Sequence, residues 1–158
     1  MQIADLPEID VVTVSHNHYD HLDIPSLKKL SAKNPKTLFL VPKGDQKLLN
    51  RKGIKNTKEF LWWENIEIKG AKFTFTPTQH WSARGLADRN KSLWGGWFMS
   101  FPSFKSFHAG DSGYSKDFLD TQAKLGKPDL SLIPIGAYAP QWFMKANHVN
   151  PEEALQVA

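Results

Sequence analysis

The sequence predicts a mixed α/β fold, because strand-like and helix-like segments alternate along its 158 residues. Residues 37–41 form an apolar run typical of a buried strand, and residues 71–76 show the alternation typical of a half-buried strand. Helix-like segments with start and stop signals lie between such runs, as in residues 115–125 before Gly126. The sequence contains no internal repeat, low-complexity tract or linker, so we expect residues 1–158 to form one domain.

Taken in order, the predicted elements each have a local signal. Asp23 is a candidate N-cap for the first helix, Gly53 ends the second, and Gly70 makes the turn of a hairpin. Pro102 marks the turn between two later strands. The predicted strands are 11–15, 37–41, 60–63, 65–69, 71–76, 93–101, 104–108 and a buried strand over 130–135, and the predicted helices are 25–32, 45–52, 115–125 and one beginning near Pro151.

Composition narrows the class of partner. The net charge of +4 is mild and fits an anionic partner such as a phosphate headgroup, but there is no basic run or stripe, so we expect no nucleic-acid partner. The chain has no cysteine and therefore no disulfide. No apolar stretch approaches membrane-spanning length. Six tryptophans are enough for some of them to serve a binding surface while others pack in the core.

The most informative segment is His16-Asn17-His18-Tyr19-Asp20-His21, which follows a strand-like run. In an extended segment residues i and i+2 project to the same side, so His16 and His18 can bind one metal ion together. Asp20 and His21 come after the chain has begun to turn, and two pairs of ligands suit two adjacent ions. The alternatives are a histidine-rich surface loop and one closed structural zinc site, although closed sites favour the cysteine that this chain lacks.

Two further ligands are predicted downstream of this loop. His80 follows an alternating strand that ends at Pro77, and Asp111 lies between small residues that allow the backbone to approach a ligand closely. A carboxylate has two oxygens, so one aspartate can bridge two cations. Alone, His80 would indicate a packed or exposed side chain and Asp111 a turn; together with the first loop, both are predicted ligands.

These residues resemble the metallo-β-lactamase fold superfamily in the pattern His16-x-His18-x-Asp20-His21, an isolated His80, and Gly110-Asp111. Finer matches resemble the branch of N-acyl-phosphatidylethanolamine-hydrolysing phospholipase D and its bacterial relatives. The segments that carry this finer resemblance are Ser15–Asp23, Thr78–Trp81, Leu93–Gly95, Ala109–Tyr114, Ile133–Tyr138, Trp142–Lys145 and His148–Ala154.

The resemblance implies an αββα sandwich with two zinc ions, although iron or manganese would also suit a site of histidine and carboxylate ligands. By motif, the implied ligands are His16, His18 and His80 for one ion, Asp20 and His21 for the other, and Asp111 as the bridge. The family pattern has a further histidine in a His-Trp-Gly-type motif that is not in this sequence, and a β-rich segment upstream. We therefore expect the chain to be the central part of the fold, cut at both ends from a longer protein.

The implied activity is hydrolysis of N-acyl-phosphatidylethanolamine-type phospholipids by metal-activated water. Asp20 and His148 are the candidate catalytic residues, and Trp81, Arg84 and Trp142 the candidate substrate-binding residues. The expected partners are a phospholipid or another anionic small molecule and a peripheral membrane contact, and the resemblance implies a second copy in a homodimer. The location is unknown from the sequence, with a cytoplasmic or membrane-peripheral one favoured. Two alternatives stay open: a hydrolase of the same fold for a soluble ester, lactone or phosphodiester, and a non-catalytic remnant that binds one metal or none.

Overall fold

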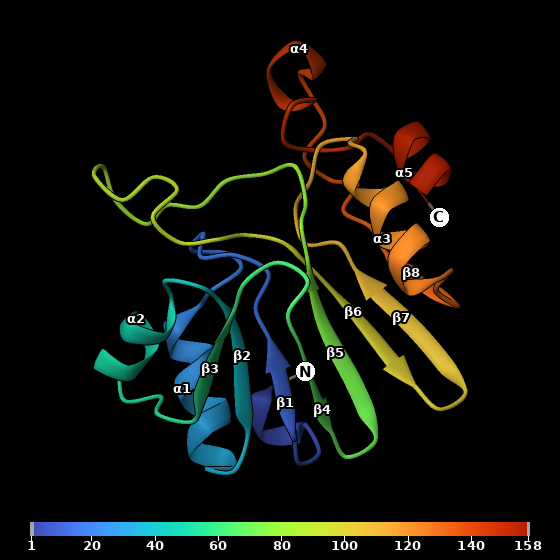
Figure 1. Cartoon of the computed structure of the whole chain (residues 1–158). Coiled ribbons are helices and arrows are strands. Elements are labelled where there is room, and N and C mark those ends of the chain that lie inside the picture. Colours follow the sequence, from blue (N-terminus) through green and yellow to red (C-terminus); the bar gives the residue numbers. More distant parts are fainter. Residues whose placement is uncertain (1, 158) are drawn as a thin grey trace. The chain divides into compact units, whose positions relative to one another are not determined.

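The computed structural model describes residues 2–157, and contacts within the chain divide them into two compact units (Figure 1). Unit 1 comprises residues 2–60 and 82–93, and unit 2 comprises residues 61–81 and 94–157. Each unit has its own β-sheet, so the prediction of a mixed α/β fold is confirmed. Within the described residues, no helix has the length and apolar character needed to cross a bilayer.

Unit 1 contains a parallel sheet in the order β1-β2-β3. Parallel neighbours need a crossover connection, and here each crossover contains a helix, α1 between β1 and β2 and α2 between β2 and β3. The Asp23 side chain accepts a hydrogen bond from the backbone N–H of Ser26, which confirms the predicted cap of α1. The elements of unit 1 are η1 Ile3–Asp5, β1 Val11–Thr13, α1 Ile24–Lys33, β2 Leu38–Pro42, α2 Gln46–Arg51 and β3 Thr57–Phe60.

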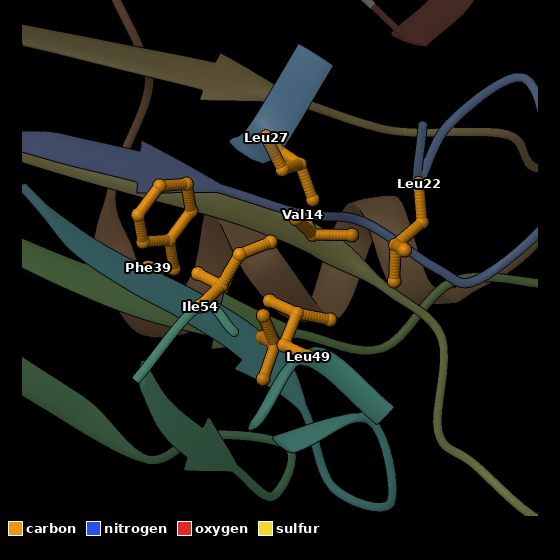
Figure 2. Packing of buried hydrophobic residues seen from close by; sticks show 7 residues of the cluster. Val14, Leu22, Leu27, Phe39, Leu49 and Ile54 are labelled. Atoms are coloured by element: carbon orange, nitrogen blue, oxygen red, sulfur yellow. The ribbon is translucent and has the colours of Figure 1, made fainter. Parts of the chain in front are cut away.

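The core of unit 1 joins both helices to the central strand (Figure 2). Leu27 of α1 and Leu49 of α2 pack in one buried cluster with Phe39 of β2. Val14 and Leu22 belong to the same cluster, and they lie at the two ends of the segment 15–21 that carries the predicted ligands. Burial of both flanking side chains fixes the two ends of this loop in the core.

Unit 2 contains a five-stranded sheet in the order β4-β5-β6-β7-β8, antiparallel up to β7 and parallel between β7 and β8. Lys69 and Gly70 both have positive φ, which is the backbone pattern of the two-residue hairpin turn between β4 and β5. Phe118 of α3 and Ala154 of α5 pack in one core with Phe107 of β7. The elements of unit 2 are β4 Asn65–Ile68, β5 Ala71–Thr76, β6 Gly96–Phe101, β7 Phe104–His108, α3 Asp117–Leu125, β8 Leu130–Leu132, α4 Gln141–Met144 and α5 Pro151–Val157.

Two predicted strands need correction. The strand expected over 60–63 lies earlier, as β3, because pairing with β2 fixes its register from Thr57 to Phe60. After Phe60 the chain turns, and Trp63 has a positive φ. The strand expected to be buried over 130–135 ends at Leu132 and is exposed, since β8 is the edge of its sheet and pairs only with β7.

Candidate metal centre

The predicted ligand loop of unit 1 leaves the carboxyl end of β1 and closes one tight turn. The backbone N–H groups of His21 and Leu22 both donate to the carbonyl of His18, at 3.1 and 2.8 Å. This turn reverses the chain between His18 and His21, so ligand groups that are close in sequence can point in different directions.

The imidazole rings of the loop are packed together. His16 Nε2 lies 2.9 Å from His18 Nδ1, and the rings of His16 and His21 have centroids 4.1 Å apart. The Ser15 hydroxyl lies 3.0 Å from His16 Nδ1, which fixes the orientation of the ring and directs Nε2 toward His18. The nitrogens of two histidines that face each other at this separation suit a shared metal ion.

Asp20 is placed differently from these three histidines. Its carboxylate is 79% exposed and lies 3.5 Å from His21 Nε2. An exposed carboxylate beside an imidazole can orient that ring or bind a metal together with it, and the geometry within unit 1 is compatible with both roles.

A second group of candidate ligands lies within unit 2. Asp111 Oδ2 is 3.8 Å from His80 Nε2 and 4.0 Å from His148 Nδ1. One ligand atom from each of the three side chains lies within 4.8 Å of the others, which is close enough for one ion to contact all three. The sequence predicted His80 and Asp111 as ligands and His148 as a catalytic residue, and the structure places the three side chains together.

Backbone contacts bring these three residues together from segments far apart in the sequence. Gln79 and Gly113 form an isolated β-bridge, with the Gly113 N–H 2.9 Å from the Gln79 carbonyl. Val149 donates its N–H to the carbonyl of Ser112 at 2.8 Å. The Gln79 side-chain amide donates to the carbonyl of Ala146 at 2.7 Å. Each candidate ligand therefore lies next to a residue whose backbone position is fixed by another of the three segments.

His80 also has the partner that a metal-binding histidine needs. Its Nδ1 lies 3.1 Å from the carbonyl oxygen of Asn147, which can only accept a hydrogen bond. Nδ1 therefore carries a proton, and in the neutral ring the lone pair lies on Nε2, the nitrogen that faces Asp111. This arrangement preselects the tautomer that binds a cation.

The three predicted substrate-binding residues lie in different surroundings. Trp81 has its ring centroid 6.2 Å from that of His80. Trp142 of α4 is 82% exposed and contacts the ring of Phe143. Arg84 Nη1 donates to the carbonyls of Asn17 and Leu22, so part of this guanidinium is engaged with the ligand loop of unit 1.

Asp45 is a buried carboxylate beside the ligand loop that the sequence did not single out. Its Oδ1 accepts a 3.0 Å hydrogen bond from the Asn17 side-chain amide, while Oδ2 has no hydrogen-bond partner. Burial raises the pKa of Asp45 to about 6, although the side chains of Ser92 and Asn17 lower it. Asp45 and Asn17 line a cleft in unit 1 with a volume of about 560 Å³.

Sequence reasoning missed the residues that support the ligands. Of these residues, only Asn17 could have been found from the sequence. It lies between two predicted ligands, where a side-chain amide can hold the loop in place by hydrogen bonding. Asn147 acts on His80 through its main-chain carbonyl, which every residue possesses, so no residue type could have indicated it. Asp45 is the first residue of the predicted helix 45–52, where acidic residues are common, so its residue type did not set it apart; in the structure it precedes α2 and makes no side-chain cap hydrogen bond.

A mixed α/β chain whose strands end in clusters of imidazole and carboxylate groups is typical of a metal-binding enzyme fold. Residues 2–158 match the family model described as Beta-lactamase superfamily domain, and the chain belongs to this family. It is 22% identical to the metallo-beta-lactamase fold protein YhfI from Bacillus subtilis, with a TM-score of 0.65 over 94% of this chain and 59% of that protein. The chain has the metallo-β-lactamase fold, as the sequence motifs implied.

Two relatives are more similar in sequence. The chain is 41% identical to the mitochondrial N-acyl-phosphatidylethanolamine-hydrolyzing phospholipase D of Saccharomyces cerevisiae, over 99% of this chain and 35% of that protein. It is 42% identical to N-acyl-phosphatidylethanolamine-hydrolyzing phospholipase D 1 of Caenorhabditis elegans, over 99% of this chain and 47% of that protein. The chain therefore spans less than half the length of these two relatives.

Proposed function

We propose that this protein is a metal-dependent hydrolase that cleaves the phosphodiester of N-acyl-phosphatidylethanolamine-type phospholipids. The observation that carries the proposal is the grouping of His80, Asp111 and His148 in unit 2, with the tautomer of His80 already set for metal binding. The two relatives named for this reaction support the choice of substrate, because their similarity covers 99% of the chain.

The donor set fits zinc, which binds histidine nitrogen and carboxylate oxygen. We propose a two-ion site in which the histidine loop and the unit 2 group each contribute ligands, as the motif order of the family implies. The proposed assignment is His16, His18 and His80 for one ion, Asp20 and His21 for the other, and Asp111 as the bridge. When bound, such a pair lowers the pKa of a coordinated water toward neutrality and stabilises negative charge on a phosphoryl group.

The residues of the chain would then hold and orient the reactants. Asp20, exposed at the end of its loop, orients the attacking water, and His148 lies where it can meet the substrate beside Asp111. In the proposed reaction the water oxygen bonds to phosphorus and the bond from phosphorus to the ethanolamine oxygen breaks. The leaving oxygen takes up a proton, so the products are phosphatidic acid and an N-acylethanolamine. Trp81 and Trp142 offer apolar contact area for the acyl chains.

The test is a metal-dependent phosphodiesterase assay on N-acyl-phosphatidylethanolamine, with zinc, iron and manganese supplied separately. We expect N-acylethanolamine release by the wild type and its loss in His16→Ala, because that change removes a proposed ligand. Equal turnover by wild type and His16→Ala would contradict the proposed site. Turnover of a soluble ester, lactone or phosphodiester in place of the phospholipid would favour the first alternative.

The number of metal ions per chain distinguishes the proposed hydrolase from the second alternative, a non-catalytic remnant. Two ions per chain support the proposed hydrolase, whereas one ion or none supports a non-catalytic remnant. Elemental analysis of the protein purified without chelator gives this number directly, and it does not depend on having chosen the right substrate.

A further inference from the structure

We infer that Arg84 is a positioning residue that clamps the metal-binding loop of unit 1 in its ligand-ready shape. One guanidinium nitrogen, Nη1, donates to the carbonyl of Asn17 at 2.9 Å and to the carbonyl of Leu22 at 2.8 Å. These two carbonyls belong to the residues directly before His18 and directly after His21. The Arg84 guanidinium thus joins the two ends of the four-residue turn that contains His18, Asp20 and His21. The inference that this contact prepares the loop for metal binding rests on the metal site proposed above.

The ring of Tyr19 adds a second contact between the loop and the same arginine. The Arg84 guanidinium carbon lies 4.0 Å from the centroid of this ring. The Tyr19 hydroxyl donates to the backbone carbonyl of Arg84 at 3.0 Å, so side chain and backbone of Arg84 are both engaged. A planar guanidinium can stack on an aromatic ring while its N–H groups donate hydrogen bonds within the plane of the guanidinium. A lysine ammonium is not planar and cannot stack in this way.

Arg84 lies in the segment 82–93, here called the arm, which is itself anchored within unit 1. The carboxylate of Asp88 accepts hydrogen bonds from the backbone N–H groups of Arg84 and Gly85, at 3.1 and 2.8 Å. At the base of the arm, the buried Ser82 hydroxyl donates to the carbonyl of Ser92 at 2.5 Å. Leu93 then donates its N–H to the carbonyl of Lys43, next to β2, at 2.8 Å. The hydrogen bonds of Asp88 near Arg84, and the one between Ser82 and Ser92 where the arm begins and ends, can hold Arg84 at a fixed place beside the loop.

The geometry points to an effect on metal binding through loop order. The turn is closed by the hydrogen bonds that the His21 and Leu22 amides donate to the His18 carbonyl, and the Arg84 contacts to Asn17 and Leu22 oppose the local opening of this turn. Supporting partners outside the metal ligands typically change metal affinity by about 10- to 100-fold when removed. Arg84 would therefore act on the metal through the loop and make no contact with the reacting atoms.

Amide hydrogen exchange of the metal-free protein tests the clamp without relying on activity. In Arg84→Ala we expect the His21 and Leu22 amides to exchange about tenfold faster or more, while the amide of Leu49 in the same unit keeps its wild-type rate. Arg84→Lys should show a smaller acceleration at the same two amides, because it keeps the charge and loses the stacking face. The matched control is Arg89→Ala, which removes the other arginine of the arm, an exposed residue.

A second measurement, zinc affinity by competition with a chelator, should show a dissociation constant about tenfold higher or more in Arg84→Ala than in Arg89→Ala. Unchanged exchange at His21 and Leu22 in both Arg84 variants would overturn the clamp. If Arg84→Ala does not fold, Arg84→Lys decides: wild-type exchange at both amides overturns the inference, and faster exchange with an unchanged Leu49 amide supports it. A wild type that binds neither zinc, iron nor manganese would instead refute the proposed function, and the exchange result would still decide whether Arg84 orders the loop.

Discussion

Asn17 donates its side-chain amide to Oδ1 of Asp45 across 3.0 Å, and both side chains are buried. Asn17 lies between His16 and His18, so this hydrogen bond ties the middle of the ligand loop to the residue that precedes α2. This hydrogen bond uses only one carboxylate oxygen, and the second oxygen of Asp45, Oδ2, and the side-chain amide oxygen of Asn17, Oδ1, have no hydrogen-bond partners. A buried carboxylate with one unsatisfied oxygen is costly to ionise.

The first prediction concerns stability against pH. Burial raises the pKa of Asp45 to about 6 from an ordinary value of 3.8. Because the folded carboxyl binds a proton more tightly than the unfolded one, this group lowers the free energy of unfolding as the pH rises from about 4 to 6. Above that range the loss is complete, and it amounts to about 3 kcal/mol at 1.36 kcal/mol per pKa unit. Asp45→Asn should remove this slope while it keeps an acceptor for Asn17.

Urea unfolding of wild type and Asp45→Asn at pH 4, 5, 6 and 7 measures the difference. The variant should gain stability relative to wild type as the pH increases. Asp45→Ala serves as the comparison, because it also removes the slope but leaves the Asn17 amide without its acceptor and should be less stable than Asp45→Asn throughout. A stability difference between wild type and Asp45→Asn that is constant from pH 4 to 7 would show that Asp45 titrates normally.

The second prediction concerns the close approach of two backbone segments at Gly113. A Cβ at this position would lie 2.6 Å from the carbonyl oxygen of Ala146, a backbone atom that cannot swing aside. Gly113→Ala should therefore push apart the segments that contain Asp111 and His148 and destabilise the protein by about 1 to 3 kcal/mol. Thermal unfolding provides the measurement, with Gly136→Ala as the control, because a Cβ at Gly136 has nothing within 4 Å. Equal stability of the two variants would contradict the close packing.

The third prediction concerns the charge of Asp111. Its Oδ2 faces both His80 and His148, so Asp111→Asn removes the negative charge that this group offers a cation. We expect zinc to bind about tenfold more weakly or worse, because a neutral amide is a poor ligand for zinc. Asp120→Asn is the matched control, since it removes a carboxylate of α3 that pairs with Lys116 on the surface. Competition with a chelator measures the affinity, and equal zinc affinity in the two variants would exclude Asp111 as a ligand.

Local signals were enough to predict most of the fold. The Asp23 cap, the Gly70 turn and the Gly126 stop act through neighbours in the sequence, and the elements they delimit are confirmed. The capping box between Asn150 and Glu153 is present as well, with reciprocal hydrogen bonds of 3.0 and 2.8 Å. These contacts join residues at most four apart in the sequence, so the sequence alone contains the information.

The strand register and the orientation of the candidate ligands depend on contacts between residues that are distant in the sequence. The register of β3 is set by its pairing with β2. The strand therefore covers Thr57–Phe60 and does not include the apolar residues Leu61–Trp63, which the sequence pattern had placed in it. The predicted site residues were chosen by residue type, but the groups that orient them are main-chain carbonyls, such as that of Asn147 on His80. Residue type does not reveal such supports, because every residue has a carbonyl.

The fourth prediction concerns the tryptophan that supports the segment before His80. Trp94 donates its indole N–H to the carbonyl of Thr78 at 2.9 Å, and its own carbonyl accepts the indole N–H of Trp62 at 2.6 Å. Thr78 is buried, so Trp94→Phe removes a hydrogen bond that water cannot easily replace. We expect a loss of about 1 to 2 kcal/mol in the free energy of unfolding.

The control for this prediction is Trp62→Phe, which removes the other indole donor from a side chain that is 37% exposed. Solvent can hydrate the Trp94 carbonyl in that variant more readily than it can hydrate Thr78, so its loss of stability should be smaller. The Thr78 carbonyl also accepts the backbone N–H of His80 at 3.1 Å, so exchange of that amide should quicken in Trp94→Phe and not in Trp62→Phe. If the two variants lose the same stability and leave the His80 amide unchanged, the Trp94 side chain contributes packing alone and does not hold the ligand segment.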